Sequence, residues 1–340
     1  MAGTGAGAGR RFVSARHFVS KADLARPAVR VTAEIALNYL DQASQAHGRL
    51  QAGGDAEALH DMRVALRQLR STLKAYSDCL TQVTRKQKKK LKRTAQATNA
   101  ARDSEVQLAY LHIWLPQMQA DRKPGGQWLE QQLRQRRAQA YTHSHQVLQA
   151  GFVKLALRLK RQLAAVPETA RSAAFGARLA QELHSTGETF RRRLQRLTVH
   201  EDDADLHAAR IAGKRLRYLI TPLSRRLGQV TALLSALKAV QDLLGEYHDM
   251  MVFENTLLEY APAAVGESVC RNLREVAQGK EPPQLNLDLL PGLYHLGGLM
   301  ARRKQALAQQ VLVHESAGDY RELFARLERL TRSAAASGIS

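Results

Sequence analysis

Basic side chains recur in this sequence at a spacing that would place them in a row along one helix. Residues three or four apart lie on the same helical face. Because a helix rises ~1.5 Å per residue, such a row would extend for about 15 Å from His60 to Arg70. Arg and Lys bind phosphate oxygens through charge-assisted hydrogen bonds, so we interpret the row as a binding site for a linear polyanion. It consists of His60, Arg63, Arg67, Arg70 and Lys74.

The same pattern returns later in the chain. Residues 59–70 read LHDMRVALRQLR, and residues 206–217 read LHAARIAGKRLR. The apolar residues between the basic ones also match, which predicts two amphipathic helices with the same basic face. The second row consists of His207, Arg210, Lys214 and Arg217.

A further match follows each row in the same order and at nearly the same offset. Two such matches indicate an internal duplication of a unit of about 145 residues. The match is broken at Asn99, which stands where the second copy has Gly245. The matched pairs are Lys92 with Lys238, Arg102 with His248, and Asp103 with Asp249.

Two interpretations of the rows are open. Aligned like charges cost a few tenths of a kcal/mol per pair, so a row is either a solvated or ion-paired face, or a binding face. Its repetition favours binding. We expect His60 and His207 to donate hydrogen bonds to the anion, which would raise their pKa; the alternative is histidines packed at helix starts. Asp103 and Asp249 are expected to orient neighbouring cations, since a carboxylate would repel the ligand.

The composition predicts an all-α fold that positions these rows. Hydrophobic residues make up 44% of the 340 residues, but aromatic residues only 5%, and helix formers dominate over strand formers. The duplication predicts two units, 28–165 and 173–333, after a flexible tail at 1–20, and Pro and Gly divide the chain into long helices. The expected helices span 28–50, 56–79, 83–115, 127–163, 173–197, 204–226, 229–260, 263–278 and 293–333, the last with an optional break at Gly318, while 279–292 is expected to be a loop.

Charge and cysteine content restrict the partners. The chain has 51 Lys and Arg against 31 Asp and Glu, a net charge of +20, which a polyanionic partner would offset. Two cysteines form neither a disulfide framework nor a zinc cluster, and neither row has a second His or a Cys at metal-binding spacing. We therefore expect no metal and no cofactor. No signal peptide or membrane-spanning segment is predicted, and a cytoplasmic location fits.

A run of basic residues at 85–93 (RKQKKKLKR) begins the helix after the first row. Cations in a first helical turn oppose the helix dipole. Lys92 is assigned to the polyanion site because Lys238 matches it. For the other cations of this run, a solvated charged surface and a contribution to binding are both open.

These motifs resemble the CHAD family, the conserved histidine α-helical domains, over residues 28–333. The resemblance rests on the two basic rows, on the segment Leu244–Asp249 and on Arg102-Asp103. It implies two antiparallel four-helix bundles, related by pseudo-twofold symmetry around a basic groove or pore that binds inorganic polyphosphate, and association of some members with polyphosphate granules. This chain departs from the family pattern at Asn99 and Ala100, at His248 in place of Arg, and at Lys214 in place of Arg.

The sequence thus predicts a non-enzymatic polyphosphate-binding protein with no catalytic residues. Two alternatives remain open. A helical nucleic-acid-binding protein has suitable charge, but aromatic stacking residues are scarce and no recognised signature is present. An enzyme that processes phosphoanhydride bonds would need a metal clamp or a Walker loop, and no GxxxxGK[ST] occurs. A phosphohistidine intermediate at His60 or His207 is the remaining enzymatic route.

Overall fold

The structure is a computed structural model that describes residues 19–52, 56–167, 170, 172–197, 203–223, 227, 230–281, 287–316 and 318–337. Within these residues the chain is all-α, as the composition predicts, and forms no strand apart from two isolated β-bridges. Two short 3-10 helices, Ala22–Ala25 and Leu115–Gln117, accompany the α-helices. The α-helices are α1 (Ala28–Gln51), α2 (Ala56–Ala75), α3 (Arg85–Ala97), α4 (Asn99–Trp114), α5 (Lys123–Ala164), α6 (Phe175–Leu197), α7 (Asp203–Ile220), α8 (Val230–Ala277), α9 (Leu290–Ser316) and α10 (Asp319–Ala336).

Two of the expected helix divisions differ in the structure. The helix expected at 83–115 is two helices, because the chain breaks at Thr98, where the backbone reaches ψ 0°. The helices expected at 229–260 and 263–278 are one, since α8 continues through Pro262. Pro262 lies on the solvent side of α8, next to the exposed Leu258, where water can bond the carbonyl that the proline leaves without a donor. The break at Gly318 is present, with its φ at +82°.

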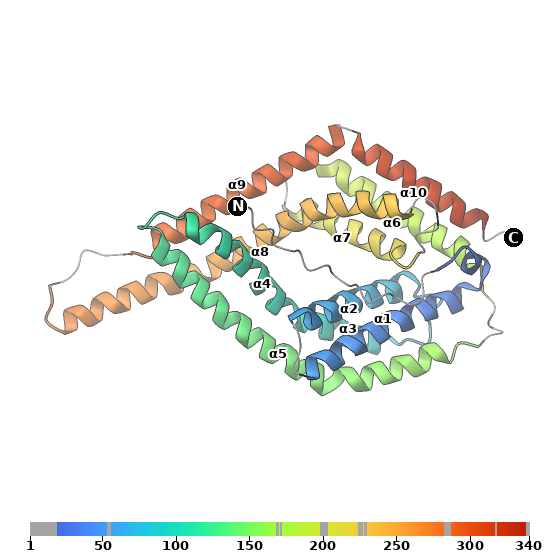
Figure 1. Ribbon diagram of the computed structural model, residues 1–340, viewed down its shortest axis with the longest axis horizontal. Helices are drawn as coiled ribbons and strands as arrows, with labels where there is room; N and C mark the ends of the chain where they lie inside the picture. Colours follow the sequence, from blue (N-terminus) through green and yellow to red (C-terminus); the bar gives the residue numbers. More distant parts are fainter. Residues whose placement is uncertain are drawn as a thin grey trace, which may run out of the picture.

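The helices surround a centre occupied by α2 and α7, which pack against each other (Figure 1). The first five helices occupy one side of the molecule and the last five the other, with α5 along one outer edge and α9 and α10 along the opposite edge (Figure 1). The C-terminal part of α8 projects beyond the other helices (Figure 1). Whether the two sides arose by duplication stays a prediction.

Backbone contacts join the two sides at both ends of the molecule. At one end, the Ala28 amide donates to the Ala173 carbonyl (2.9 Å), and the Phe175 amide donates to the Arg26 carbonyl (2.8 Å). At the other end, α5 approaches α9 so closely that a Cβ on Gly125 would lie 2.0 Å from the Leu289 carbonyl oxygen. Glycine is therefore required at this crossing.

Of the predicted flexible tail at 1–20, the structure describes only Val19 and Ser20. Residues 1–18 lie outside the described residues. Val19 is buried, and its amide donates to the Pro222 carbonyl (2.8 Å). The side chain of Ser20 donates to Asp23 (2.7 Å).

The apolar faces of α2 and α7 fix the direction of their basic faces. In α2, Leu66, Leu69 and Leu73 are almost fully buried, and burial of each leucine contributes about 1.5–3 kcal/mol. In α7, Leu216 is buried in the same way, and Gly213 lies under Phe190, whose Cε2 would be 2.9 Å from an added Cβ. Each helix is thus held by its apolar side, which leaves the basic row on the other.

Candidate polyanion-binding site

Arg63, predicted to bind the ligand, is used within the protein. Its side chain is buried, only 8% exposed, and its guanidinium donates to the Thr98 carbonyl, to the Thr98 hydroxyl (3.1 Å) and to the Asn99 side chain (3.2 Å). It therefore caps the C-terminus of α3 at the break before α4. Burial, followed by the charge of Arg67, lowers the pKa of Arg63 to about 10.

Arg67 and Arg70 continue the α2 row. Unlike Arg63, they make no hydrogen bond or ion pair with the part of the chain that the structure describes. The Nε atom of Arg67 is buried and unbonded. Burial lowers the pKa of Arg70, and the charge of Arg67 lowers it further. A buried, unbonded guanidinium nitrogen is costly, and an anion is the group that would satisfy it.

The α7 row is similarly unsatisfied. Arg210 forms no bond with any described residue, and its Nε atom is buried. Lys214 has no partner among those residues either, and burial together with the nearby charges of Arg210 and Arg67 lowers its pKa to about 7. Arg217 packs over the ring of Tyr218, with its guanidinium carbon 5.7 Å from the ring centre.

The two rows act on each other across the contact between α2 and α7. The charge of Arg67, on α2, lowers the pKa of both Arg210 and Lys214, on α7. At the other end of the rows, the charge of Arg215 lowers the pKa of the exposed Lys74. The rows therefore belong to one electropositive region and are not two separate surfaces.

The histidines at the row ends differ from each other. His207 lies against His248 of α8, with their Nδ1 atoms 3.2 Å apart and their ring centres 4.8 Å apart. One Nδ1 donates to the other, so the pair cannot hold a proton on both. Burial and the charge of Arg210 lower the pKa of His248 to about 3. Among the described residues His60 has no such ring partner, and burial with the charge of Arg102 lowers its pKa.

Two half-buried carboxylates, Asp103 and Asp249, lie among the cations. That they orient the neighbouring cations stays a prediction. Burial raises the pKa of both, while the surrounding cations, Arg63 at Asp103 and Arg210 at Asp249, oppose that rise. The two aspartates also interact electrostatically with each other. They reduce the net positive charge of the site and lie where they act on Arg63 and Arg210.

The remaining predicted residues are peripheral or engaged with other groups. Lys238 is exposed and forms an ion pair with Asp242 one turn away. Arg102 forms an ion pair with Glu105 (3.1 Å), which in turn accepts a hydrogen bond from Tyr141. Lys92 is exposed on α3, without a partner in the described part of the chain. The structure therefore brings together Arg67, Arg70, Lys74, Arg210, Lys214 and Arg217, with His60, His207 and His248 at the edges.

Sequence reasoning missed two residues of this region. Arg215 lies beside Lys74, although its helical position is not on the predicted row. Tyr218 stacks with Arg217, and its charged form would raise the pKa of Tyr39 on α1. Neither residue lies at a predicted row position, and the approach of Arg215 to Lys74 depends on how α7 packs against α2.

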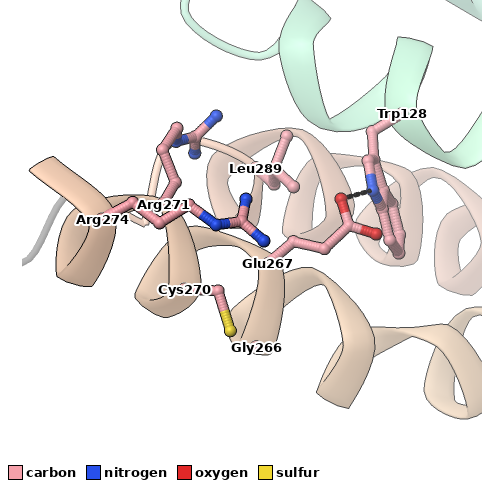
Figure 2. A pocket seen from close by; sticks show the side chains of 7 residues that line it. All are labelled: Trp128, Gly266, Glu267, Cys270, Arg271, Arg274 and Leu289. Carbon is pink, nitrogen blue, oxygen red and sulfur yellow. Dashed lines mark hydrogen bonds between the residues drawn. The ribbon is translucent and has the colours of Figure 1, made fainter.

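A cavity of about 520 Å³ lies elsewhere, where α5 and α8 meet the start of α9. Figure 2 shows Trp128 donating to Glu267 (2.8 Å), with Arg271 and Arg274 farther along α8 on the other side of Glu267. None of the predicted site residues lines this cavity. In the described part of the chain no group of three metal-binding side chains occurs, and no described helix is long and apolar enough to cross a membrane.

These features define an all-helical protein with a central cationic region between two of its helices. The sequence profile of the CHAD domain matches residues 34–258, and the chain belongs to the CHAD-domain family. Its fold is similar to the crystal structure of the CHAD domain from the plant Ricinus communis (TM-score 0.58, 23% identity, 90% of this chain and 93% of that one). It is also similar to PptA from Streptomyces chartreusis (TM-score 0.63, 17% identity, 84% of this chain and 99% of that one). No curated protein sequence matches the chain.

Proposed function

We propose that this protein binds inorganic polyphosphate through the facing rows of α2 and α7, and that it does so without catalysing a reaction. The observation that carries the proposal is the pair of buried, unbonded guanidinium nitrogens of Arg67 and Arg210, which interact across the α2–α7 contact. Each needs an acceptor that the described residues do not supply. The CHAD family is associated with polyphosphate, and a linear phosphate polymer offers acceptors along a whole row.

The chemistry of the site favours a phosphate polymer over the alternatives. Arg and Lys neutralise phosphate without reading a base. Neither row contains a Phe, Tyr or Trp, and Tyr218 stacks beside Arg217 at the end of the second row. Nucleic-acid binding through stacked bases would require more such rings. Phosphoanhydride chemistry would require a metal clamp or an activated nucleophile. His207 is engaged with His248, so its Nδ1 atom is not free to attack phosphorus. Where polyphosphate granules form, we propose that the protein associates with them.

A calorimetric titration of the full chain with long-chain polyphosphate, triphosphate and duplex DNA tests this function. Polyphosphate should bind more tightly than DNA at equal phosphate concentration. Because bound cations release counterions, its affinity should fall by orders of magnitude between about 50 and 500 mM salt. Release of orthophosphate should be absent with and without Mg²⁺. An affinity that does not change with salt, or a preference for DNA, would overturn the proposal.

A further inference from the structure

The basic run at 85–93 forms a second charged surface with the C-terminal half of α5. We propose that this surface, the α3/α5 strip, binds a further stretch of the polyphosphate chain that the α2 and α7 rows hold. The inference rests on the proposed function and extends it. The strip consists of Lys86, Lys89, Lys90 and Arg93 of α3 with Lys154, Arg158 and Arg161 of α5, all of them exposed.

The packing of α3 against α5 brings these cations onto one surface. The two helices run antiparallel, because the Ser144 hydroxyl donates to the Ala97 carbonyl (3.0 Å) at one end and Gln87 donates to Gln162 (2.5 Å) at the other. Between these contacts Lys90 lies over α5, where a Cβ on Gly151 would be 3.2 Å from its Nζ atom. Lys154 and Arg158 follow Gly151 at intervals of three and four residues, and they therefore project on the same side of α5.

Positive charge on the strip is uncompensated. The sequence has no Asp or Glu between Asp78 and Asp103, and none between Glu130 and Glu168. Consistently, no cation of the strip forms an ion pair with a described residue. Elsewhere on the surface, pairing is common: in the first half of α5 itself, Arg134 pairs with Glu130 (2.5 Å) and Arg136 pairs with Glu259 (2.7 Å).

Helix stability does not account for this arrangement. Cations in the first turn of α3 oppose its dipole, and like charges three or four residues apart repel each other. The packing of α3 comes instead from Leu91, Thr94 and Ala95, which are buried. The strip thus costs stability in the free protein, and a bound polyanion would offset that cost.

A phosphate polymer fits this surface better than a membrane does. The strip is elongated along the seam of two antiparallel helices, and its flexible lysines suit an irregular chain of phosphates. Two apolar side chains, Val153 (47% exposed) and Leu157 (57% exposed), lie beside it on α5. These two residues offer little area for insertion into a lipid surface, which normally takes a continuous apolar helix face.

Binding of one polymer to both surfaces would make affinity depend on chain length. A polymer already held between α2 and α7 keeps its free end close to the protein, so that binding at the strip becomes intramolecular. Long chains would engage both surfaces, whereas triphosphate can engage only one. The strip should therefore determine preference for polymer length.

The test compares two fourfold variants of the full chain. The strip variant carries Lys86→Gln, Lys90→Gln, Lys154→Gln and Arg158→Gln. A matched control carries Arg134→Gln, Lys280→Gln, Arg326→Gln and Arg329→Gln, which removes the same charge from cations that are paired with neighbouring carboxylates. Binding of triphosphate and of long-chain polyphosphate is measured by calorimetry, and circular dichroism checks that both variants stay helical.

We expect the strip variant to lose about tenfold or more in affinity for long-chain polyphosphate, and to keep triphosphate affinity within about twofold. The control should bind both ligands almost as the unsubstituted protein does. Unchanged affinity of the strip variant for long-chain polyphosphate, or an equal loss in both variants, would overturn the proposal that the strip binds the polymer. The proposal would also be overturned if the strip variant lost binding to phosphatidylserine vesicles but kept its polyphosphate affinity. The strip would then be a membrane-binding surface.

Failure of the proposed function itself has a different signature. If the central site is wrong but the strip is right, Arg67→Ala with Arg210→Ala leaves triphosphate affinity unchanged while the strip variant still loses long-chain affinity. If the central site is right and the strip is wrong, only the central variant loses affinity. No polyphosphate binding by the unsubstituted protein would overturn both proposals.

Discussion

Arg63 and Arg210 occupy matched positions in the two rows, but their surroundings differ. Arg63 bonds the Thr98 carbonyl, the Thr98 hydroxyl and the Asn99 side chain at the break between α3 and α4. In the second half the position that matches Asn99 is Gly245, and α8 passes through it without a break. Arg210 therefore finds no side-chain acceptor there, and it bonds no described residue.

Two differences thus separate a structural arginine from an available one: Thr98 and Asn99 stand where the second half has Leu244 and Gly245. A side-chain amide at residue 99 gives the neighbouring guanidinium a partner, and the helix break exposes the Thr98 carbonyl to it. With glycine and an unbroken helix, both acceptors are missing. Both rows consist of His, Arg and Lys, but at this matched position the arginine of α7 is available to an anion and that of α2 is not.

The largest expected effect concerns the two unbonded arginines. Arg67→Ala with Arg210→Ala removes a charge-assisted contact at each position, about 1.5–3 kcal/mol each. Long-chain polyphosphate affinity should fall by about 100-fold or more, while the protein remains folded. The measurement is calorimetric titration at constant salt, with Arg326→Ala and Arg329→Ala as a control of equal charge. Unchanged affinity would show that the rows are solvated faces.

The next largest effect concerns the free energy of unfolding. We expect Arg63→Ala to lower it and Arg210→Ala not to lower it. Arg63→Ala leaves the Thr98 carbonyl buried without its donor and should lower the free energy of unfolding by about 1–3 kcal/mol. Arg210→Ala removes a buried, unbonded cation and should leave stability unchanged or slightly higher. Urea denaturation followed by circular dichroism measures both. Equal destabilisation by the two variants would contradict the distinction between the matched positions.

Much of this architecture could be predicted from the sequence, because helix formers, breakers and the basic spacing are local signals. The all-α class and the helices of both rows followed from them. The break at Thr98 could not be predicted, because the sequence around residue 98 contains no Pro or Gly. Pro262 predicted a break instead, but α8 continues through it. The role of Arg63 depends on the break at Thr98. The nearness of Arg215 to Lys74 and of His248 to His207 likewise depends on tertiary packing, which helical spacing does not determine.

The smallest expected effect is a proton taken up on binding, and it depends on Lys214. This side chain faces Arg210 and Arg217 on its own helix, Arg67 on α2 and Asp249 on α8. Burial and the three arginines lower its pKa to about 7, so at pH 8 it is mostly neutral in the free protein. A bound polyanion would favour the charged form and raise that pKa. Binding at pH 8 should therefore take up close to one proton, and affinity should weaken as pH rises further.

Calorimetry at pH 8 in buffers of different ionisation enthalpy measures this uptake, and Lys214→Arg is the deciding variant. Arginine stays charged at this pH, so the variant should bind without taking up the proton and with affinity equal to or above that of the unsubstituted protein. The free energy of unfolding gives an independent check. Because the pKa of Lys214 is lower in the folded state than its ordinary 10.5, the unfolded state binds more protons between about pH 7 and 10.5, and stability should rise with pH across that interval. Lys214→Gln should flatten this rise, and proton uptake that persists in Lys214→Arg would assign it instead to the histidines at the row ends.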